Sequence, residues 1–227
     1  MPLPADLTGD SLTPSARKLG AISGAAVAFL CLAYAVILLV GLLSLPSPNR
    51  QIQQPWFTIM EVLIICISPA MVALTVALHA GASTDRKSLA LASVVFMSMS
   101  AVITCTVHFA ILTLARNPAF ASEPWARSVF SFQWPSVAYA LDILSWDVLF
   151  PVAALFAALS VQGPGLASAV RVLLYASAAL AFLGLAGVAV ENMQVRNVGI
   201  LGYAVLFPIA AGLLASLFHK AGNDNAA

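Results

Sequence analysis

Long apolar stretches occupy most of this chain and decide what it can fold into. The sequence contains six stretches that are each long enough to cross a lipid bilayer, which takes roughly 20 apolar residues. Of its 227 residues, 61% are hydrophobic and 8% are charged, against about 25% charged in an ordinary globular domain. Backbone groups inside a bilayer must find hydrogen bonds within their own segment, which favours helices. The sequence therefore predicts an all-α, polytopic membrane protein.

The predicted membrane domain covers residues 17–219 and consists of six helices arranged as three hairpins. A flexible polar leader, residues 1–16, precedes this domain, and a polar tail, residues 220–227, follows it. The connections are short except for residues 116–135, the aromatic loop, which carries five aromatic side chains and is expected to lie at the membrane interface. It could be a plain interfacial connector or a lid over the end of the bundle. The expected spans are 19–45, 56–79, 88–115, 136–161, 166–188 and 197–218.

Two of the predicted helices share a short sequence. Trp146–Leu159 and Tyr203–Leu217 both contain Val-Leu-Phe-Pro followed by Val or Ile and two alanines. Prolines fall within all three even-numbered spans, at Pro69, Pro151 and Pro208. Because proline removes a backbone hydrogen bond and crowds the preceding turn, we expect the even-numbered helices to be kinked.

Ionisable side chains inside the predicted spans are the strongest indication of function. Glu61, His108 and Asp142 lie on three different helices, and the rise of an α-helix places all three about 9 to 12 Å from the same membrane boundary. A carboxylate in the bilayer costs at least about 2.5–3.5 kcal/mol, so it is usually paired, protonated or exposed to a cavity. The three groups are therefore expected to converge beneath the aromatic loop. Glu191, Asn192 and Arg196 lie near the same boundary.

Asp147 is expected to be separate from this group. It lies roughly 18 Å from that boundary, near the middle of the bilayer. Five residues of α-helix separate it from Asp142, so the two side chains should point about 140° apart. Asp147 would then pair with another helix or line a deeper cavity.

The sequence leaves two interpretations of these residues open. In the first, Glu61, His108, Asp142 and Asp147 are acid/base residues of a pocket with aromatic walls. In the second, they form an interhelical hydrogen-bond network that only fixes packing. The aromatic residues expected to line the pocket are Trp56, Trp125, Trp134, Tyr139 and Trp146.

Several classes of site are not expected. The net charge of +1 provides no basic surface for nucleic acid. The ionisable residues share no helix at metal-binding spacing, so neither a metal nor another cofactor is predicted. The three cysteines form no CxxC pair and are interpreted as packing residues. There is also no phosphate-binding loop, no GxSxG sequence and no lysine within a span.

Three functions remain open on the sequence alone. The leading hypothesis is a site for a lipid, isoprenoid or other hydrophobic small molecule, which the protein either binds or transforms as a cofactor-independent isomerase, cyclase or hydrolase. The alternatives are a small proton-coupled transporter or channel and a non-catalytic accessory subunit, as a homo-oligomer or within a larger membrane complex. Lysine and arginine are distributed six to four between the two sides, which favours both termini in the cytoplasm of a bacterial inner membrane.

Overall fold

The six expected membrane helices are present in the computed structural model, which describes residues 12–47, 52–115 and 117–223. The first three crossings are the single helices α1 (Pro14–Leu43), α2 (Trp56–Gly81) and α3 (Lys87–Thr113). The fifth is α8 (Leu166–Ala189). Each crossing is long and apolar enough to span a bilayer, and no strand occurs in the described residues. The predicted all-α fold with six spans is thereby confirmed.

The fourth and sixth crossings are each interrupted by a short π-helix. The fourth consists of α6 (Val137–Ile143), the π-helix η1 (Leu144–Leu149) and α7 (Phe150–Ser160). The sixth consists of α9 (Met193–Arg196), α10 (Val198–Ile200), the π-helix η2 (Leu201–Leu206) and α11 (Phe207–Asn223). Two one-turn helices, α4 (Pro118–Ala121) and α5 (Ala126–Val129), lie in the aromatic loop.

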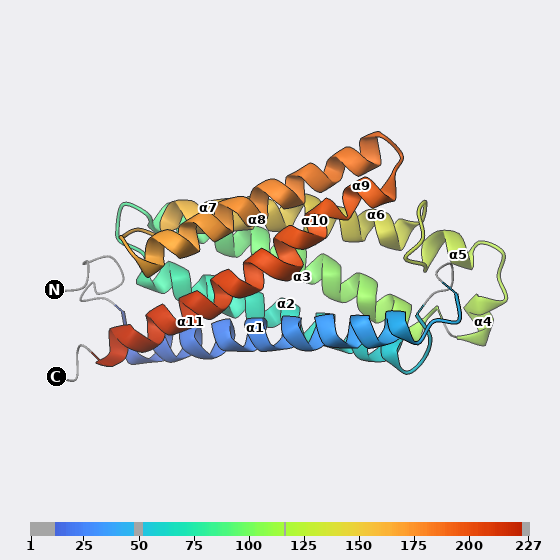
Figure 1. Ribbon diagram of the computed structural model, residues 1–227, viewed down its shortest axis with the longest axis horizontal. Coiled ribbons are helices and arrows are strands. Elements are labelled where there is room, and N and C mark those ends of the chain that lie inside the picture. The colour runs from blue at the N-terminus through green and yellow to red at the C-terminus, as the bar shows by residue number, and fades with distance from the viewer. Residues whose placement is uncertain (1–11, 48–51, 116, 224–227) are drawn as a thin grey trace.

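The helices run back and forth along one long axis, so the bundle has two distinct ends (Figure 1). The terminal end is the end at which α1 begins and α11 ends, and Arg17 there donates to the Ala221 carbonyl. The loop end carries α4 and α5. Residues 14–16 and 220–223 are helical, and Thr13 caps the start of α1. Residues 1–11 of the predicted leader and 224–227 of the tail lie outside the described residues.

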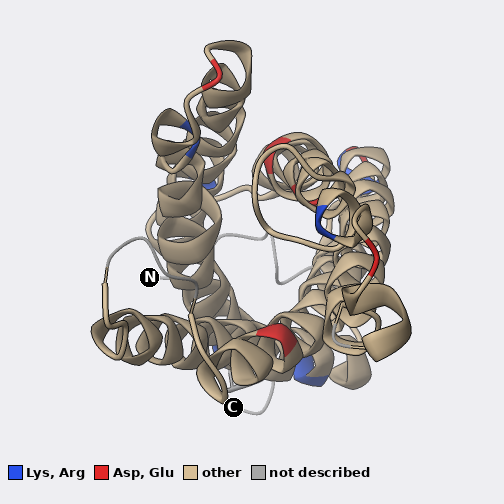
Figure 2. Ribbon diagram, turned by 90° about the vertical axis from the view of Figure 1, so that its right-hand side faces the viewer, with Lys and Arg blue, Asp and Glu red and all other residues tan. Residues whose placement is uncertain are grey.

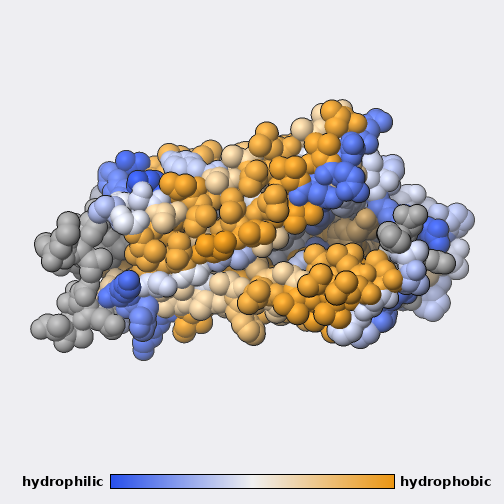
Figure 3. All heavy atoms as spheres, in the orientation of Figure 1, coloured by the Kyte–Doolittle hydropathy of each residue, from blue (hydrophilic) through white to orange (hydrophobic). Residues whose placement is uncertain are grey.

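The fourth crossing lies at the centre of the bundle. In the most apolar 18-residue stretch of this crossing 67% of the residues are buried, against 11% in the corresponding stretch of α1. Alanines on α7, α8 and α11 let these helices pack closely, with Phe150, Phe207 and Phe218 filling the space between them. The outer surface is apolar across the middle of the face shown in Figure 3, and hydrophilic residues gather at both ends. This arrangement fits a protein surrounded by lipid along its length.

The two π-helices overlap the starts of the two copies of the shared sequence, and they end two residues before Pro151 and Pro208. In each copy the backbone N–H of the phenylalanine donates to the carbonyl five residues earlier. Phe150 donates to the Ser145 carbonyl, and Phe207 donates to the Gly202 carbonyl. The Ser145 carbonyl also accepts the Ser100 hydroxyl at 3.1 Å, and the Gly202 carbonyl accepts a serine hydroxyl of α8 at 2.9 Å. The shared sequence therefore produces the same local structure twice.

Candidate functional site

Five ionisable side chains meet inside the loop-end half of the bundle and form a continuous chain of contacts, here called the ionic network. They come from five segments, α2, α3, α6, η1 and α9. Each residue is at most 9% exposed. Figure 2, which looks along the bundle from the loop end, shows acidic and basic positions scattered over ribbons that are otherwise uncharged. The members of the ionic network are Glu61, His108, Asp142, Arg196 and Asp147.

Glu61 and His108 form the first contact of the network. The Nδ1 atom of His108 lies 2.8 Å from Oε2 of Glu61. When Glu61 is ionised it can only accept, so Nδ1 carries the proton and Nε2 of a neutral ring holds a lone pair. Nε2 forms no hydrogen bond and lies 3.5 Å from Oδ1 of Asp142. This nitrogen is therefore the atom of His108 that can exchange a proton.

Arg196 joins the two aspartates. Its Nε donates to Oδ2 of Asp147 at 2.8 Å, and its Nη2 donates to Oδ2 of Asp142 at 3.4 Å. The shorter distance makes Asp147 the stronger partner. Nη1 donates to the Tyr139 hydroxyl at 3.1 Å, and the guanidinium carbon lies 4.9 Å from the centre of the Tyr139 ring. One guanidinium thus holds two carboxylates and a phenol.

The expected separation of Asp147 from Asp142 is wrong, because both carboxylates bind Arg196. The prediction assumed an unbroken α-helix, whereas Asp147 lies in η1. A π-helix is hydrogen-bonded over five residues and not four, so residues five apart lie closer to one face than in an α-helix. Ser145 in η1 is held by hydrogen bonds to Ser100 and Thr104 of α3, which fixes the π-helical turn in place.

Glycines on α8 and α10 make room for Arg196 and Asp147. A β-carbon at position 187 would lie 2.3 Å from the Arg196 amide nitrogen, which is far inside van der Waals contact. β-Carbons at Gly199 and Gly184 would lie 2.7 and 3.1 Å from Oδ1 of Asp147. That oxygen is buried and has no hydrogen-bond partner. The small residues let α9 and α10 approach α8 closely enough for the ion pair to form.

The charges of the ionic network do not balance by themselves. It contains three carboxyl groups but one guanidinium and one imidazole. An uncompensated buried charge costs several kcal/mol. To be neutral, the cluster must therefore hold two protons distributed among its carboxyl groups and its imidazole. Such a cluster can accept and release protons in the interior of the bundle.

The aromatic loop covers the network on the side of the loop end. Phe132 packs against His108, with ring centres 5.0 Å apart. Trp134 packs edge-on against Tyr139 at 6.3 Å, and Tyr139 in turn contacts Arg196. The loop therefore contacts His108 directly through Phe132 and approaches Arg196 through the contact of Trp134 with Tyr139 of α6.

The other three expected wall residues lie elsewhere. Trp125 packs against Phe120 and Phe130 within the loop. Trp146 packs against Tyr203 with the rings tilted by 40° and their centres 5.1 Å apart, so it pairs the two copies of the shared sequence. Trp56 begins α2 and lies against α1. Of the five predicted wall residues, Tyr139 contacts the ionic network, and Trp134 packs against Tyr139.

Sequence reasoning missed two residues of this site. Arg196 was placed near the correct boundary but not assigned to the acids, and Phe132 was treated only as one aromatic residue of the loop. One signal was present for Arg196: it is a cation bordering an apolar stretch, and a face of α8 with Gly184 and Gly187 lies opposite it. The contact of Phe132 with His108 depends on the path of the loop and has no local signature.

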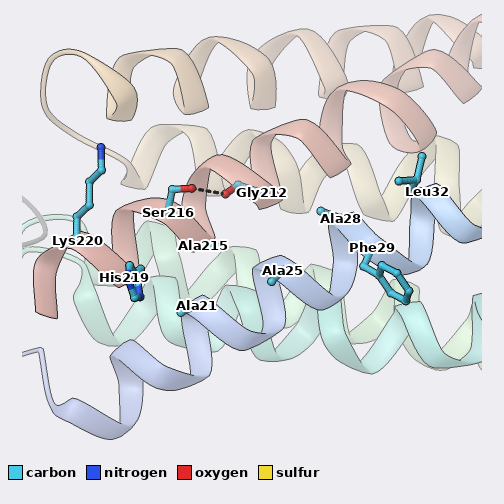
Figure 4. Close-up of a pocket in the computed structure, with 10 residues that line it drawn as sticks. All are labelled: Ala21, Ala25, Ala28, Phe29, Leu32, Gly212, Ala215, Ser216, His219 and Lys220. Carbon is cyan, nitrogen blue, oxygen red and sulfur yellow. Dashed lines mark hydrogen bonds between the residues drawn. The ribbon is translucent and has the colours of Figure 1, made fainter.

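The described cavities lie away from the network. A groove of about 700 Å³ runs between α1 and α11, where it is lined by small residues and ends at His219 and Lys220 (Figure 4). A second cavity of about 380 Å³ lies at the terminal end, between the α2–α3 turn, α7 and α8. Within the described part of the chain, no three His, Cys, Asp or Glu side chains are arranged to hold a metal ion.

Comparisons with known proteins add nothing to this picture. No protein-family model, curated protein or solved structure matches the chain. The geometry of the ionic network is therefore the observation that bears on function.

Proposed function

We propose that the protein binds a lipid, isoprenoid or other hydrophobic small molecule at the ionic network and transforms it by acid/base chemistry. One observation carries this proposal. His108 is oriented by Glu61 through Nδ1, while its Nε2 faces Asp142 beneath Phe132 without a hydrogen bond. A buried imidazole held by a carboxylate on one nitrogen is the usual arrangement of a general base.

The other members of the network have complementary roles in this proposal. His108 accepts a proton from the ligand at Nε2, and Asp142, protonated before the reaction, gives one to the ligand. The proton on Nε2 then passes to Asp142, 3.5 Å away, and restores both groups. Arg196 and Asp147 hold Asp142 in position. The reaction is an isomerisation, cyclisation or hydrolysis that needs no further cofactor. Because the network is closed by the aromatic loop, the ligand must reach it by displacement of Phe132.

The proposal can be tested on the full-length protein purified in mild detergent. Hydrophobic compounds that copurify are extracted and compared by mass spectrometry between the wild type, His108→Ala and the control Lys87→Gln. A compound retained by the wild type and the control but lost from His108→Ala supports the site. When that compound is incubated in D₂O, the wild type should introduce deuterium or convert it, and Glu61→Gln should not. Equal compound profiles in all three proteins would remove the proposal.

A second function, proton-coupled transport, is favoured by the unbroken contacts from Glu61 to Asp147. Against it, all members of the ionic network lie in the loop-end half, whereas the buried polar side chains of the terminal-end half are hydroxyls such as those of Thr75, Ser93 and Ser160. Liposomes holding the protein and a pH-sensitive dye separate the two functions. Proton flux that is present in the wild type and absent in Asp147→Asn favours transport, whereas silent liposomes favour the one-sided site.

For location, we propose a bacterial inner membrane with both termini in the cytoplasm. The support is the charge distribution, since Arg17, Lys18, Arg86, Lys87 and Lys220 all belong to the terminal end and basic residues collect on the cytoplasmic side. The aromatic loop and the ionic network then open toward the outside. The proposed partner is the hydrophobic ligand itself, and assembly into a homo-oligomer or larger complex remains a proposal.

A further inference from the structure

A second site is indicated at the terminal end, opposite the ionic network. The cavity of about 380 Å³ there is lined by residues from the α2–α3 turn, α7, the α7–α8 connection and α8. Two of its lining residues are arginines, Arg86 and Arg171, and none is acidic. Its remaining lining residues are Ala158, Leu159, Val161, Gln162 and Tyr175.

Both guanidinium groups are held in place by the end of α7. Arg86 donates through Nη1 to the Leu159 carbonyl at 3.2 Å, and Arg171 donates through Nη1 to the Val161 carbonyl at 3.5 Å. Cations are favoured at this position because the carbonyl end of a helix is partially negative. A guanidinium has five N–H donors in a planar fork, and these contacts orient each arginine.

Arg86 is ion-paired with an acid on its outer side. Asp85 contacts Arg86 at 3.3 Å, but its side chain is 68% exposed and does not line the cavity. The Ser83 hydroxyl also donates to Asp85 at 2.6 Å. The cavity therefore combines two fixed cations, the amide of Gln162 and an exposed tyrosine, at the level where a bilayer changes from headgroups to acyl chains.

We propose that this cavity binds a phosphate group, supplied by the headgroup of an anionic phospholipid. Paired arginine forks match the oxygens of a phosphate, and arginine is preferred wherever such groups are recognised. Tyr175 lies one turn deeper on α8 than Arg171, where its amphipathic ring suits the glycerol level of a lipid. This site is separate from the ionic network, so its test does not depend on the proposed function.

The alternative is that the two arginines only cap α7. Gln162→Glu distinguishes the two, because it places a negative charge in the cavity and leaves both arginine–carbonyl contacts intact. The single hydrogen of the Ser83 hydroxyl is directed mainly to Asp85 at 2.6 Å, so its longer 3.4 Å approach to the Gln162 oxygen is a minor contact. Lys87→Gln is the matched control, since it removes an exposed cation next to Arg86 that does not line the cavity.

The experiment measures lipid retention by native mass spectrometry of the full chain, purified in neutral detergent and offered equal amounts of phosphatidylglycerol and phosphatidylcholine. The wild type and Lys87→Gln should retain phosphatidylglycerol preferentially. Arg86→Gln, Arg171→Gln and Gln162→Glu should each lower that retention roughly tenfold, the effect of losing one charge-assisted hydrogen bond. If an arginine variant fails to fold, lipid retention by Gln162→Glu decides between a phosphate site and helix caps.

Three outcomes would overturn the assignment. Unchanged retention in Gln162→Glu would leave the arginines as helix caps. If Lys87→Gln and Arg171→Gln lose phosphatidylglycerol equally, retention depends on general surface charge and not on the cavity. In a parallel arm, inorganic phosphate is added without lipid. If phosphate raises the melting temperature of the wild type but not of Arg171→Gln, while lipid retention is the same in all variants, a soluble phosphate compound and not a lipid fills the cavity.

Discussion

Arg196 is the residue on which the buried charges of this protein depend most. It contacts Asp142, Asp147 and Tyr139 at once, and it is 4% exposed. Asp147 is completely buried, and Arg196 is its only side-chain hydrogen-bond partner among the described residues. Removing the guanidinium would leave both aspartates without their cation in a low-dielectric interior.

Substitution Arg196→Gln is therefore expected to lower the free energy of unfolding by about 3–5 kcal/mol, the cost of breaking a buried ion pair from one side. Denaturant titration in detergent measures this change in the free energy of unfolding. Arg127→Gln, an exposed position in the aromatic loop, is the control and should change stability by less than about 0.5 kcal/mol. In the double variant Arg196→Gln/Asp147→Asn much of the loss should be recovered, because the stranded charge is gone. Equal effects at positions 196 and 127 would show that the ion pair contributes nothing.

At this scale the sequence predicted about half of the site. Glu61, His108 and Asp142 could be brought together because depth along an α-helix follows directly from residue number. Asp147 could not be placed, because its direction depends on a π-helical turn that tertiary contacts with α3 stabilise. Arg196 was missed because a residue at the edge of a span can turn inward or outward, and the glycines that draw it inward belong to another helix.

At the scale of elements, close helix approach is what brings the ionic network together. The α8–α9 contact depends on Gly187, where a β-carbon would lie 2.3 Å from a backbone nitrogen that cannot move independently. Gly187→Ala should therefore destabilise the protein by about 1–3 kcal/mol and weaken the Arg196–Asp147 contact.

Gly212→Ala is the control for this prediction. Its added β-carbon would meet only the Ala28 β-carbon at an ordinary 3.6 Å, so it should be neutral or raise stability by up to about 1 kcal/mol through helix propensity. Thermal unfolding in one detergent compares the two variants. If both alanines are tolerated equally, α8 and α9 do not pack as described.

The two π-helical turns give a second prediction at this scale. Ser177 is fully buried, and its hydroxyl donates to the Gly202 carbonyl of η2 across two helices. Ser177→Ala should cost about 1 kcal/mol, the net contribution of one buried hydrogen bond. Ser98→Ala, which removes a bond made only within its own helix to the Val94 carbonyl, should cost less. A reversed order in unfolding experiments would argue against the serine as a support of η2.

The elements themselves were largely predictable. Apolar length located all six crossings, and each α-helical or mixed crossing begins and ends within a few residues of the expected span. The shared Val-Leu-Phe-Pro sequence indicated that the fourth and sixth helices would resemble one another. It did not indicate a π-helix, because the extra residue per turn is accommodated by serines on neighbouring helices and not by the proline alone.

At the scale of the whole molecule, the two ends have different chemistry. The loop end holds the ionic network under aromatic side chains, and the terminal end holds most of the basic residues and the two-arginine cavity. The core between them is rich in alanine and contains buried serine and threonine hydroxyls. A molecule built in this way has a fixed direction in its membrane, and each end contacts a different compartment.

Cysteine labelling tests this direction. In a background in which the three native cysteines are alanine, single cysteines are introduced at Thr84, Ser122 and Gln194, which are exposed. Thr84 lies in the α2–α3 turn at the terminal end, while Ser122 and Gln194 lie at the loop end. A membrane-impermeant maleimide added to intact cells should label positions 122 and 194, and position 84 only after the membrane is opened.

The pattern separates the fold from its orientation. Labelling of Thr84→Cys alone in intact cells would keep the six-helix arrangement but reverse the proposed direction, because the positive-inside bias of this chain is small. Simultaneous labelling of Thr84→Cys and Ser122→Cys from one side would instead contradict the up-and-down order of the crossings. Such labelling would also place the ionic network and the two-arginine cavity on the same side of the membrane. One crossing, α3, separates Thr84 from Ser122, so the described fold places them on opposite sides.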